Sequence, residues 1–391
     1  MRPVAITGIG VISPCGIGID AFWAGLCAEP ADGVERRVGD FDPEPWFGTK
    51  EARRTDRFAQ FAVVAAAMAL DDAGQPSFDP DRSGVIIGTG IGGLATLQEQ
   101  ISVMLEKGDR RVSPFTVPMM MANAGAANVS MRFGWRGPCE TISTACAAGT
   151  HSVGAGARLV ADGRADAVLA GGSEAAITRI GVAAFGNMTA LSPSGISRPF
   201  DAERDGFVIG EGSAVLVLEP LDAARARGAR IYAVITGAAS NADAHHITAP
   251  APGGSGAVSC MELALNDAGR RPDEVGHVNA HGTSTQLNDA AEAEAIAKLF
   301  GAGSVPVTSI KGVTGHGLGA AGALEAAALA ISIDRKLIPP TARHHTPDPA
   351  VDIDVVAGEP RPWEPRAALS NSFGFGGHNG CLVLEPVPAS A

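Results

Sequence analysis

The stretch Ser143-Thr144-Ala145-Cys146-Ala147-Ala148-Gly149 decides the fold, because it joins a strand-like run to a helix-like run. The β-branched residues of 139–144 predict a short strand, and the small and aliphatic residues of 147–162 predict a helix buried on several sides. Cys146 therefore lies near a helix N-terminus, where free N–H groups and the helix dipole favour a nucleophilic thiolate. A buried, inert thiol is the alternative, since free cysteine is among the most buried residue types.

Composition narrows the class of protein. The chain has 391 residues, of which 46% are hydrophobic, and a formal charge of -12 from 30 basic and 42 acidic residues. The acidic balance argues against nucleic acid as the main partner. Six scattered cysteines without a CxxC pair predict reduced thiols and a cytoplasmic protein. The N-terminus lacks a signal-peptide layout, and charged residues or glycines interrupt every apolar run, so we expect no membrane association.

Two short landmarks occur twice and in the same order. Ile6-Thr7-Gly8 returns as Ile235-Thr236-Gly237, and Leu216-Val217-Leu218-Glu219-Pro220 returns at 382–386. Their order indicates an internal duplication, with one half over residues 1–228 and the other over 229–391. Strand candidates alternate with helical segments in both halves, which predicts βαβ units and largely parallel sheets. The expected fold class is α/β with two related halves.

Five residues directly follow strand candidates: Cys146, His281, Lys311, His316 and Phe375. By count, Cys146 ends the third strand of the first half and Lys311 ends the third strand of the second half. In open α/β layers the chemistry collects at the carboxyl ends of the strands. The topology therefore predicts that these residues share one face, although they lie far apart in the sequence.

A cysteine with two histidines and a lysine allows several chemistries. Nucleophilic catalysis would use two neutral imidazoles as hydrogen-bond donors or acid–base groups. A cysteine protease needs one base and an orienting Asn or Asp, which leaves the second histidine and the lysine unused. A metal site is weaker still, because no carboxylate or third imidazole stands at ligand spacing. The glycine turn at 88–93 has the wrong spacing for a dinucleotide fingerprint.

The chain resembles a known family, the β-ketoacyl-acyl-carrier-protein synthases, and is most similar to the elongating, synthase II-like ketosynthases. The similarity runs nearly end to end. The motifs that carry it are TACAAG at 144–149, NAHGTST at 279–285, SIKGVTGHGLGAAGALE at 309–325 and NSFGFGGHNG at 371–380, with supporting matches at 88–94, 197–212 and 241–248. The resemblance implies a thiolase-like duplicated αβαβα layered fold with two pseudo-symmetric halves, usually dimeric.

The resemblance also implies roles for single residues. Cys146 would take the acyl chain from an acyl carrier protein, and His281 and His316 would hold the malonyl thioester and stabilise the enolate as carbon dioxide leaves. Lys311 would supply positive charge together with Glu325. The backbone N–H groups of Phe375 and Cys146 would form the oxyanion hole, and Phe375 would act as a gate. The product would be a 3-oxoacyl-acyl-carrier-protein in fatty-acid or type II polyketide synthesis.

Substrate contacts follow in the same way. The pantetheine arm would meet Thr283 and Thr285, with Thr248 in a supporting motif, and Leu97, Phe185 and Met119 are candidates for the acyl pocket. No metal or redox cofactor is implied, because decarboxylation drives the reaction and the phosphopantetheine arrives on the acyl carrier protein. The expected partners are that carrier protein and a second thiolase-fold chain, in a homodimer or in a heterodimer with a ketosynthase-like chain-length factor.

The departures from the family leave alternatives open. His378 stands where many members have Thr, and the chain is shorter than a housekeeping synthase near 36–50 and 193–197. A ketosynthase subunit that needs a chain-length partner is therefore the second hypothesis. A non-catalytic partner subunit would lack the nucleophile, which Cys146 contradicts, and a thiolase would carry different distal motifs. The acyl chain length cannot be read from the sequence.

Overall fold

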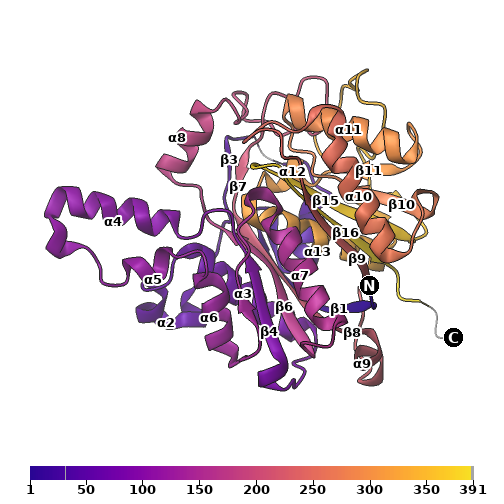
Figure 1. Ribbon diagram of the computed structural model, residues 1–391. Helices are drawn as coiled ribbons and strands as arrows, with labels where there is room; N and C mark the ends of the chain where they lie inside the picture. The colour runs from indigo at the N-terminus through magenta and orange to yellow at the C-terminus, as the bar shows by residue number, and fades with distance from the viewer. Residues whose placement is uncertain (31, 389–391) are drawn as a thin grey trace.

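A computed structural model describes residues 1–30 and 32–388 of the chain. Its core is a twelve-stranded mixed sheet flanked by helices, together with two small two-stranded sheets (Figure 1). At the centre of the large sheet, β1 (Val4–Ser13) pairs antiparallel with β9 (Ala233–Ala242), so the sheet is continuous across the two halves. No helix among the described residues has the length and apolarity needed to cross a bilayer.

Both halves of the sheet have the same strand order. Outward from the centre, the first half continues with β8 (Gly212–Pro220), β6 (Ala167–Glu174), β4 (Ser83–Gly88) and β5 (Cys139–Glu140). Outward from β9, the second half continues with β16 (His378–Glu385), β15 (Ala367–Gly374), β10 (Val275–Asn279) and β11 (Pro306–Thr308), and β13 (Asp354–Val355) adds an edge. In each half the two inner pairings are antiparallel and the two outer ones parallel. The predicted duplicated α/β fold is confirmed. The expectation of largely parallel sheets is wrong, because the last strand of each half, β8 or β16, runs antiparallel to both of its neighbours.

The repeated sequence landmarks make the same contact in both halves. Thr7 donates a hydrogen bond from its hydroxyl to Glu219 at 2.5 Å, and Thr236 donates one to Glu385 at 2.8 Å. Each pair joins the first strand of its half to the last strand. The predicted boundary at 228/229 lies between β8, which ends at Pro220, and β9.

The glycine of each landmark permits a helix to approach the sheet. A Cβ atom at Gly8 would lie 2.1 Å from the carbonyl oxygen of Ala69 in α3 (Arg57–Asp72). A Cβ atom at Gly237 would lie 2.4 Å from the carbonyl oxygen of Ala264 in α10 (Ser255–Ala268). Only glycine fits at these contacts, which explains why the landmark ends on it.

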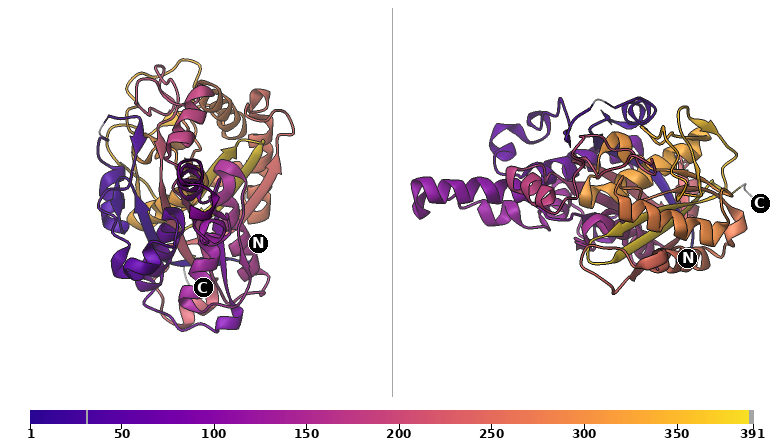
Figure 2. Two further views of the ribbon diagram at one scale, coloured as in Figure 1. Left: turned by 90° about the vertical axis from the view of Figure 1, so that its left-hand side faces the viewer. Right: turned by 90° about the horizontal axis from the view of Figure 1, so that it is seen from above.

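Helices cover both faces of the sheet. Successive residues of a strand point to opposite faces, and in β8 Leu216 and Leu218 face the cluster that contains α7 (Ala148–Ala161) and α13 (Ala321–Arg335), whereas Val215 and Val217 face α3. The helices α7 and α13 pack on each other and on strands of both halves. The order of layers is therefore α3, the first half of the sheet, α7 with α13, the second half of the sheet, and α10. Figure 2 shows the molecule from two further sides.

The first half also contains β3 (Glu35–Arg36) and α2 (Glu44–Ala52). One segment differs from the sequence-based expectation. The strand expected over 139–144 ends at Glu140, because the chain turns there toward Cys146. A long arm made of α4 (Leu94–Lys107) and α5 (Thr116–Met120) projects from the first half (Figures 1 and 2).

Candidate active site

Cys146 lies in a tight backbone turn between β5 and α7. The residues Ala145–Ala147 form a single 3₁₀ turn, and Ala145 has a left-handed φ of 50°. A non-glycine residue in this region costs conformational energy, which is typical of functional sites. Gly374, the last residue of β15, packs against the turn, since a Cβ atom there would lie 2.9 Å from the carbonyl oxygen of Thr144. The nucleophile candidate is thus held by segments from both halves.

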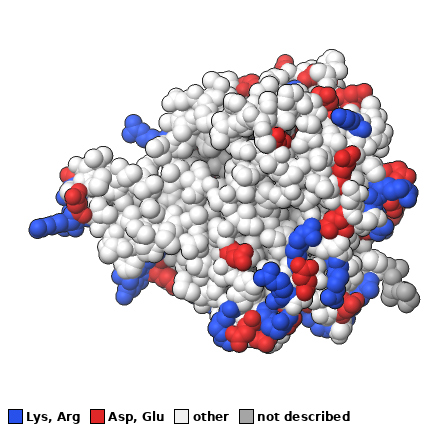
Figure 3. Space-filling model, viewed as in Figure 1, with Lys and Arg blue, Asp and Glu red and all other residues white. Residues whose placement is uncertain are grey.

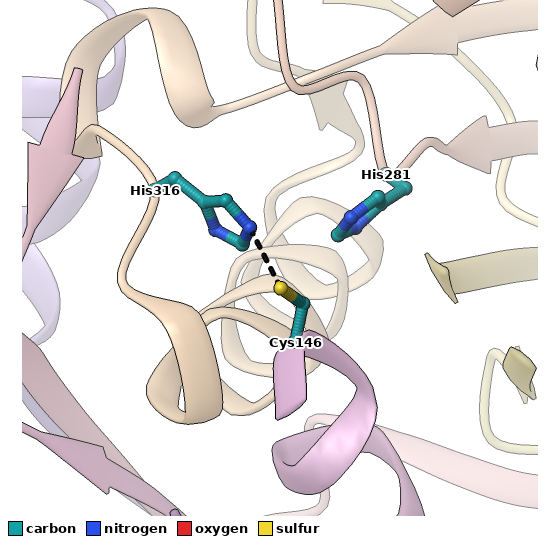
Figure 4. A group of neighbouring side chains, drawn as sticks. All are labelled: Cys146, His281 and His316. Carbon is teal, nitrogen blue, oxygen red and sulfur yellow. Dashed lines mark hydrogen bonds between the residues drawn. The ribbon is translucent and has the colours of Figure 1, made fainter. Parts of the chain in front are cut away.

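Two imidazoles of the second half converge on the cysteine. His316 Nε2 lies 3.1 Å from Cys146 Sγ, and the rings of His281 and His316 are 5.4 Å apart at their centroids (Figure 4). His281 follows β10, and His316 follows α12 (Lys311–Thr314) after the end of β11. The expectation that strand-end residues of both halves share one face is therefore met for these three side chains.

Lys311 fixes the proton of His281. Its ammonium contacts His281 Nδ1 at 3.3 Å, donates a hydrogen bond to the His281 carbonyl oxygen at 2.5 Å and forms a buried ion pair with Glu325. An ammonium group can only donate, so Nδ1 must accept. The proton of the neutral ring then resides on Nε2, which makes that atom a hydrogen-bond donor.

Burial keeps the reactive groups neutral. It raises the pKa of Cys146 to about 11, although the positive charge of Lys311 and the backbone N–H of Phe375 act in the opposite direction. Burial, followed by the charge of Lys311, holds the pKa values of His281 and His316 well below the usual range. Burial is the largest influence on the pKa of this thiol, and α7 begins two residues after it at Ala148, so the structure favours a neutral thiol at rest over the expected thiolate. The two neutral imidazoles agree with the expectation.

Two buried glutamates outside the predicted site residues, Glu174 and Glu292, hold the loops that carry the histidines. Glu174, at the end of β6, accepts from the N–H groups of Gly90 at 2.6 Å and Gly319 at 3.1 Å, so it ties a loop of the first half to the loop that carries His316. Glu292 accepts from the N–H groups of His281 at 2.8 Å and Gly282 at 2.7 Å. A carboxylate at the end of a strand that is otherwise apolar was the available signal for Glu174.

A cavity of about 320 Å³ reaches the three side chains. The predicted residues Thr248, Thr283, Thr285 and Phe185 line it, together with Phe375. The described residues that line this cavity do not include Leu97 or Met119, since both lie on the projecting arm. An acyl pocket lined by these two residues is therefore not formed by this chain alone.

The same cluster has to be considered as a metal site. The potential ligand atoms of Cys146, His281 and His316 lie within 4.8 Å of one another, and a cysteine with two histidines suits zinc. The ammonium of Lys311, in contact with His281 Nδ1, opposes a second cation at this position by charge repulsion. The donor set is better suited to holding an anionic or carbonyl oxygen.

Comparison with known proteins gives the family. The N-terminal domain model of β-ketoacyl synthase matches residues 25–224, and the C-terminal domain model matches residues 232–345. The chain belongs to the β-ketoacyl synthase family. It is 44% identical to 3-oxoacyl-[acyl-carrier-protein] synthase 2 of Synechocystis, over 98% of both chains, and 43% identical to the protein of that name from Staphylococcus aureus strain N315, over 99% of both.

Solved structures of the β-ketoacyl synthase family have the same fold. The ishigamide ketosynthase/chain length factor matches with a TM-score of 0.93 and 35% identity, covering 99% of this chain and 100% of that one. A β-ketoacyl synthase from Burkholderia phymatum matches with a TM-score of 0.91 and 34% identity, with the same coverage. The predicted recognition, thiolase-like fold and enzyme class are confirmed. The predicted boundary at 228/229 falls between the two segments that the family models match.

Proposed function

We propose that this chain catalyses the decarboxylative Claisen condensation of an acyl chain held on Cys146 with malonyl-acyl-carrier-protein, which gives a 3-oxoacyl-acyl-carrier-protein. The observation that carries the proposal is the 3.1 Å contact of Cys146 Sγ with His316 Nε2, with His281 beside it in the same cavity. The relatives named 3-oxoacyl-[acyl-carrier-protein] synthase 2 support this reaction over that of a thiolase.

In the first half-reaction, Cys146 attacks the thioester of the acyl carrier protein. Because the thiol is neutral at rest, its proton has to leave during the attack, and His316 Nε2 is the base within reach. The N–H groups of Cys146 and Phe375 stabilise the oxyanion that forms. Collapse of this intermediate gives acyl-Cys146 and the free thiol of the carrier arm, so the proton balance of this step is neutral.

In the second half-reaction, the malonyl thioester loses carbon dioxide. His281 donates its Nε2 proton in a hydrogen bond to the thioester oxygen, and the adjacent charge of Lys311 strengthens this donor. His316 Nε2 provides a second contact when it carries a proton. The enolate carbon attacks the acyl carbonyl, the thiolate of Cys146 leaves, and this thiolate takes up one proton. No metal or redox cofactor takes part.

The carrier protein would deliver its phosphopantetheine arm through the cavity. Thr283 and Thr285 are linked by a 2.9 Å hydrogen bond at its wall, and Thr248 lines the same space. Hydroxyl groups of this kind suit the amides of the arm. A type II polyketide ketosynthase solved in complex with its acyl-carrier protein matches this chain with a TM-score of 0.90, which supports a carrier protein as the partner. Six unpaired cysteines, all within the described residues, support a reducing, cytoplasmic location.

A second thiolase-fold chain would cover the projecting arm and complete the acyl pocket around Leu97 and Met119. The exposed apolar side chains of the arm include Ile101, Leu105, Phe115 and Val117. The middle of the face in Figure 3 carries few charged side chains, as is typical of the core of a protein interface. A second copy would serve fatty-acid synthesis. A chain-length factor, as named in two of the similar solved structures, would serve a polyketide pathway.

Intact-protein mass spectrometry tests the proposal. Wild-type protein mixed with acyl carrier proteins of graded chain length should gain the acyl mass on Cys146 and release a 3-oxoacyl product when malonyl-acyl-carrier-protein is added. Cys146→Ala should lose both, whereas Cys139→Ala, at an exposed cysteine, should keep both. Full elongation by Cys146→Ala would overturn the proposal. The oligomeric state of the purified chain distinguishes a homodimer from a subunit that needs a partner.

A further inference from the structure

The condensation, if it proceeds as proposed above, consumes one proton inside an enclosed site. The malonyl carboxylate leaves as carbon dioxide, the new carbon–carbon bond expels the thiolate of Cys146, and this thiolate must be protonated before the next cycle. At that moment the carrier arm fills the cavity that leads to Cys146. Lys311 and Glu325 are each only 1% exposed, so water has no direct access from their side. A path that avoids the filled cavity would supply this proton while the arm is still in place.

A chain of hydroxyl groups starts at the buried ion pair. Ser372 of β15 donates a hydrogen bond from Oγ to Glu325 Oε2 at 3.4 Å, and Thr150 Oγ1 of α7 lies 2.7 Å from Ser372 Oγ. Because the Ser372 hydrogen points to Glu325, the oxygen of Ser372 is free to accept the hydrogen of Thr150. The two hydroxyl hydrogens then point in the same direction, toward Glu325.

The backbone leaves space for this hydroxyl pair. Gly322 of α13 faces it, and a Cβ atom at that position would lie 2.1 Å from Thr150 Oγ1 and 2.9 Å from Ser372 Oγ. An alanine at 322 would therefore displace the pair. Thr150 and Ser372 are both fully enclosed by α7, α13 and β15, and their hydroxyls satisfy each other in an otherwise apolar contact between these elements.

The outer end of the chain reaches a second cavity. This cavity, of about 620 Å³, lies between α7, β9 and α10, and Thr150 is one of its lining residues. On its outer side, the side chain of Arg158 is 49% exposed and Leu263 is 46% exposed, so the space communicates with solvent. Among the described residues, none lines both this cavity and the one that contains Cys146. The two openings are independent.

We propose that the Thr150–Ser372 hydroxyl pair is a proton path that supplies the condensation step from the second cavity. Water in that cavity gives a proton to Thr150, Thr150 passes its own proton to Ser372, and Ser372 passes its proton to Glu325. Glu325 protonates Lys311 as Lys311 gives a proton to His281 Nδ1, and His281 Nε2 gives its proton to the thiolate. One ring nitrogen of His281 lies within 4.8 Å of Cys146 Sγ. Thr150, Ser372, Glu325 and Lys311 end with the protons that they began with, and the sum is one proton moved from water to Cys146. His281 gains a proton on Nδ1 as it loses one from Nε2, so its ring has to regain the Nε2–H tautomer before the next cycle.

Only the condensation step would use this path, so the two half-reactions can be compared to test it. Acylation is neutral in protons, whereas condensation takes up one. Thr150→Val removes the hydroxyl at nearly constant volume, Ser372→Ala removes the next one, and Thr150→Ser keeps it. Ser152→Ala is the matched control, because Ser152 lies on the same helix, is buried, and its hydroxyl has no hydrogen-bond partner among the residues that the structure describes.

Single-turnover assays in H₂O and D₂O measure the two steps. We expect Thr150→Val and Ser372→Ala to form acyl-Cys146 at the wild-type rate but to condense about 10²-fold more slowly, at the low end of what positioned proton transfer contributes. Thr150→Ser should retain the wild-type rate and its solvent isotope effect. The proposal is overturned if Thr150→Val condenses like Ser152→Ala, or if it slows acylation and condensation equally. If Thr150→Val does not fold, a wild-type condensation without a solvent isotope effect also overturns it. Absence of acyl-Cys146 in the wild type would instead refute the proposed function.

Discussion

Glu325→Gln would leave a positive charge uncompensated in the centre of the protein. Lys311 and Glu325 are both 1% exposed, and the ammonium of Lys311 has no route to solvent. The removal of one partner of a buried ion pair costs about 3–5 kcal/mol. We therefore expect the free energy of unfolding to fall by about that amount, which is at least a hundredfold in the folding equilibrium constant.

A matched control separates this effect from the loss of any buried glutamate. Glu219 is also 1% exposed, but its partner Arg227 is 29% exposed and can turn to water. Glu219→Gln should therefore cost only about 1 kcal/mol, as is usual for ion pairs near the surface. Urea denaturation of both variants and of the wild type measures the difference.

The same variant changes the chemistry in a defined order. Without Glu325 the ammonium loses its anchor beside His281 Nδ1, so the proton of the ring is no longer held on Nε2. Decarboxylation of malonyl-acyl-carrier-protein should fall by about 10²-fold, the usual contribution of a positioned acid, while acylation of Cys146 remains measurable. Equal stability of the two glutamine variants, or wild-type decarboxylation by Glu325→Gln, would refute this account of the site.

Three further predictions concern burial and packing. Burial raises the pKa of Glu174 from 4.5 to about 7, so the folded state holds a proton that the unfolded state releases, and the free energy of unfolding should fall as the pH rises between these values. Glu174→Gln should reduce that slope by up to about 1.4 kcal/mol per pH unit; an unchanged slope contradicts the assignment. Alkylation of Cys146 by iodoacetamide should still accelerate above pH 9, because its pKa is raised to about 11; a plateau near pH 7 would point to a resting thiolate. Gly8→Ala should destabilise the fold by more than 1 kcal/mol because its Cβ atom meets Ala69, whereas Gly39→Ala, which meets nothing within 4 Å, should be neutral in thermal denaturation.

The sequence was sufficient for the parts of the fold that depend on local pattern and order. The repeat of Ile6-Thr7-Gly8 predicted two equivalent halves, and the strand ends predicted that Cys146 and His281 would meet. The protonation of Cys146 could not be predicted in this way, because it depends on how completely other segments remove water from the thiol. The role of Glu174 was missed for the same reason, since its partners Gly90 and Gly319 come from distant segments.

The acyl pocket illustrates another limit. Leu97 and Met119 were predicted to line the acyl pocket, yet both lie on the projecting arm and neither lines the cavity of its own chain. A sequence motif records which residues serve a site, but it does not record which subunit they serve. For this reason the pocket residues stay a prediction until the partner chain is known.

The pairing of β1 with β9 joins two copies of one scaffold that carry unlike chemical groups. The first copy presents the sulfur and the second presents the imidazoles and the ammonium, at corresponding strand ends. Neither copy alone can complete a catalytic cycle, so the seam between them is a functional joint as well as a structural one. A substitution that shifts the copies by about an ångström would move the sulfur away from the imidazoles and reduce the rate by about 10²-fold.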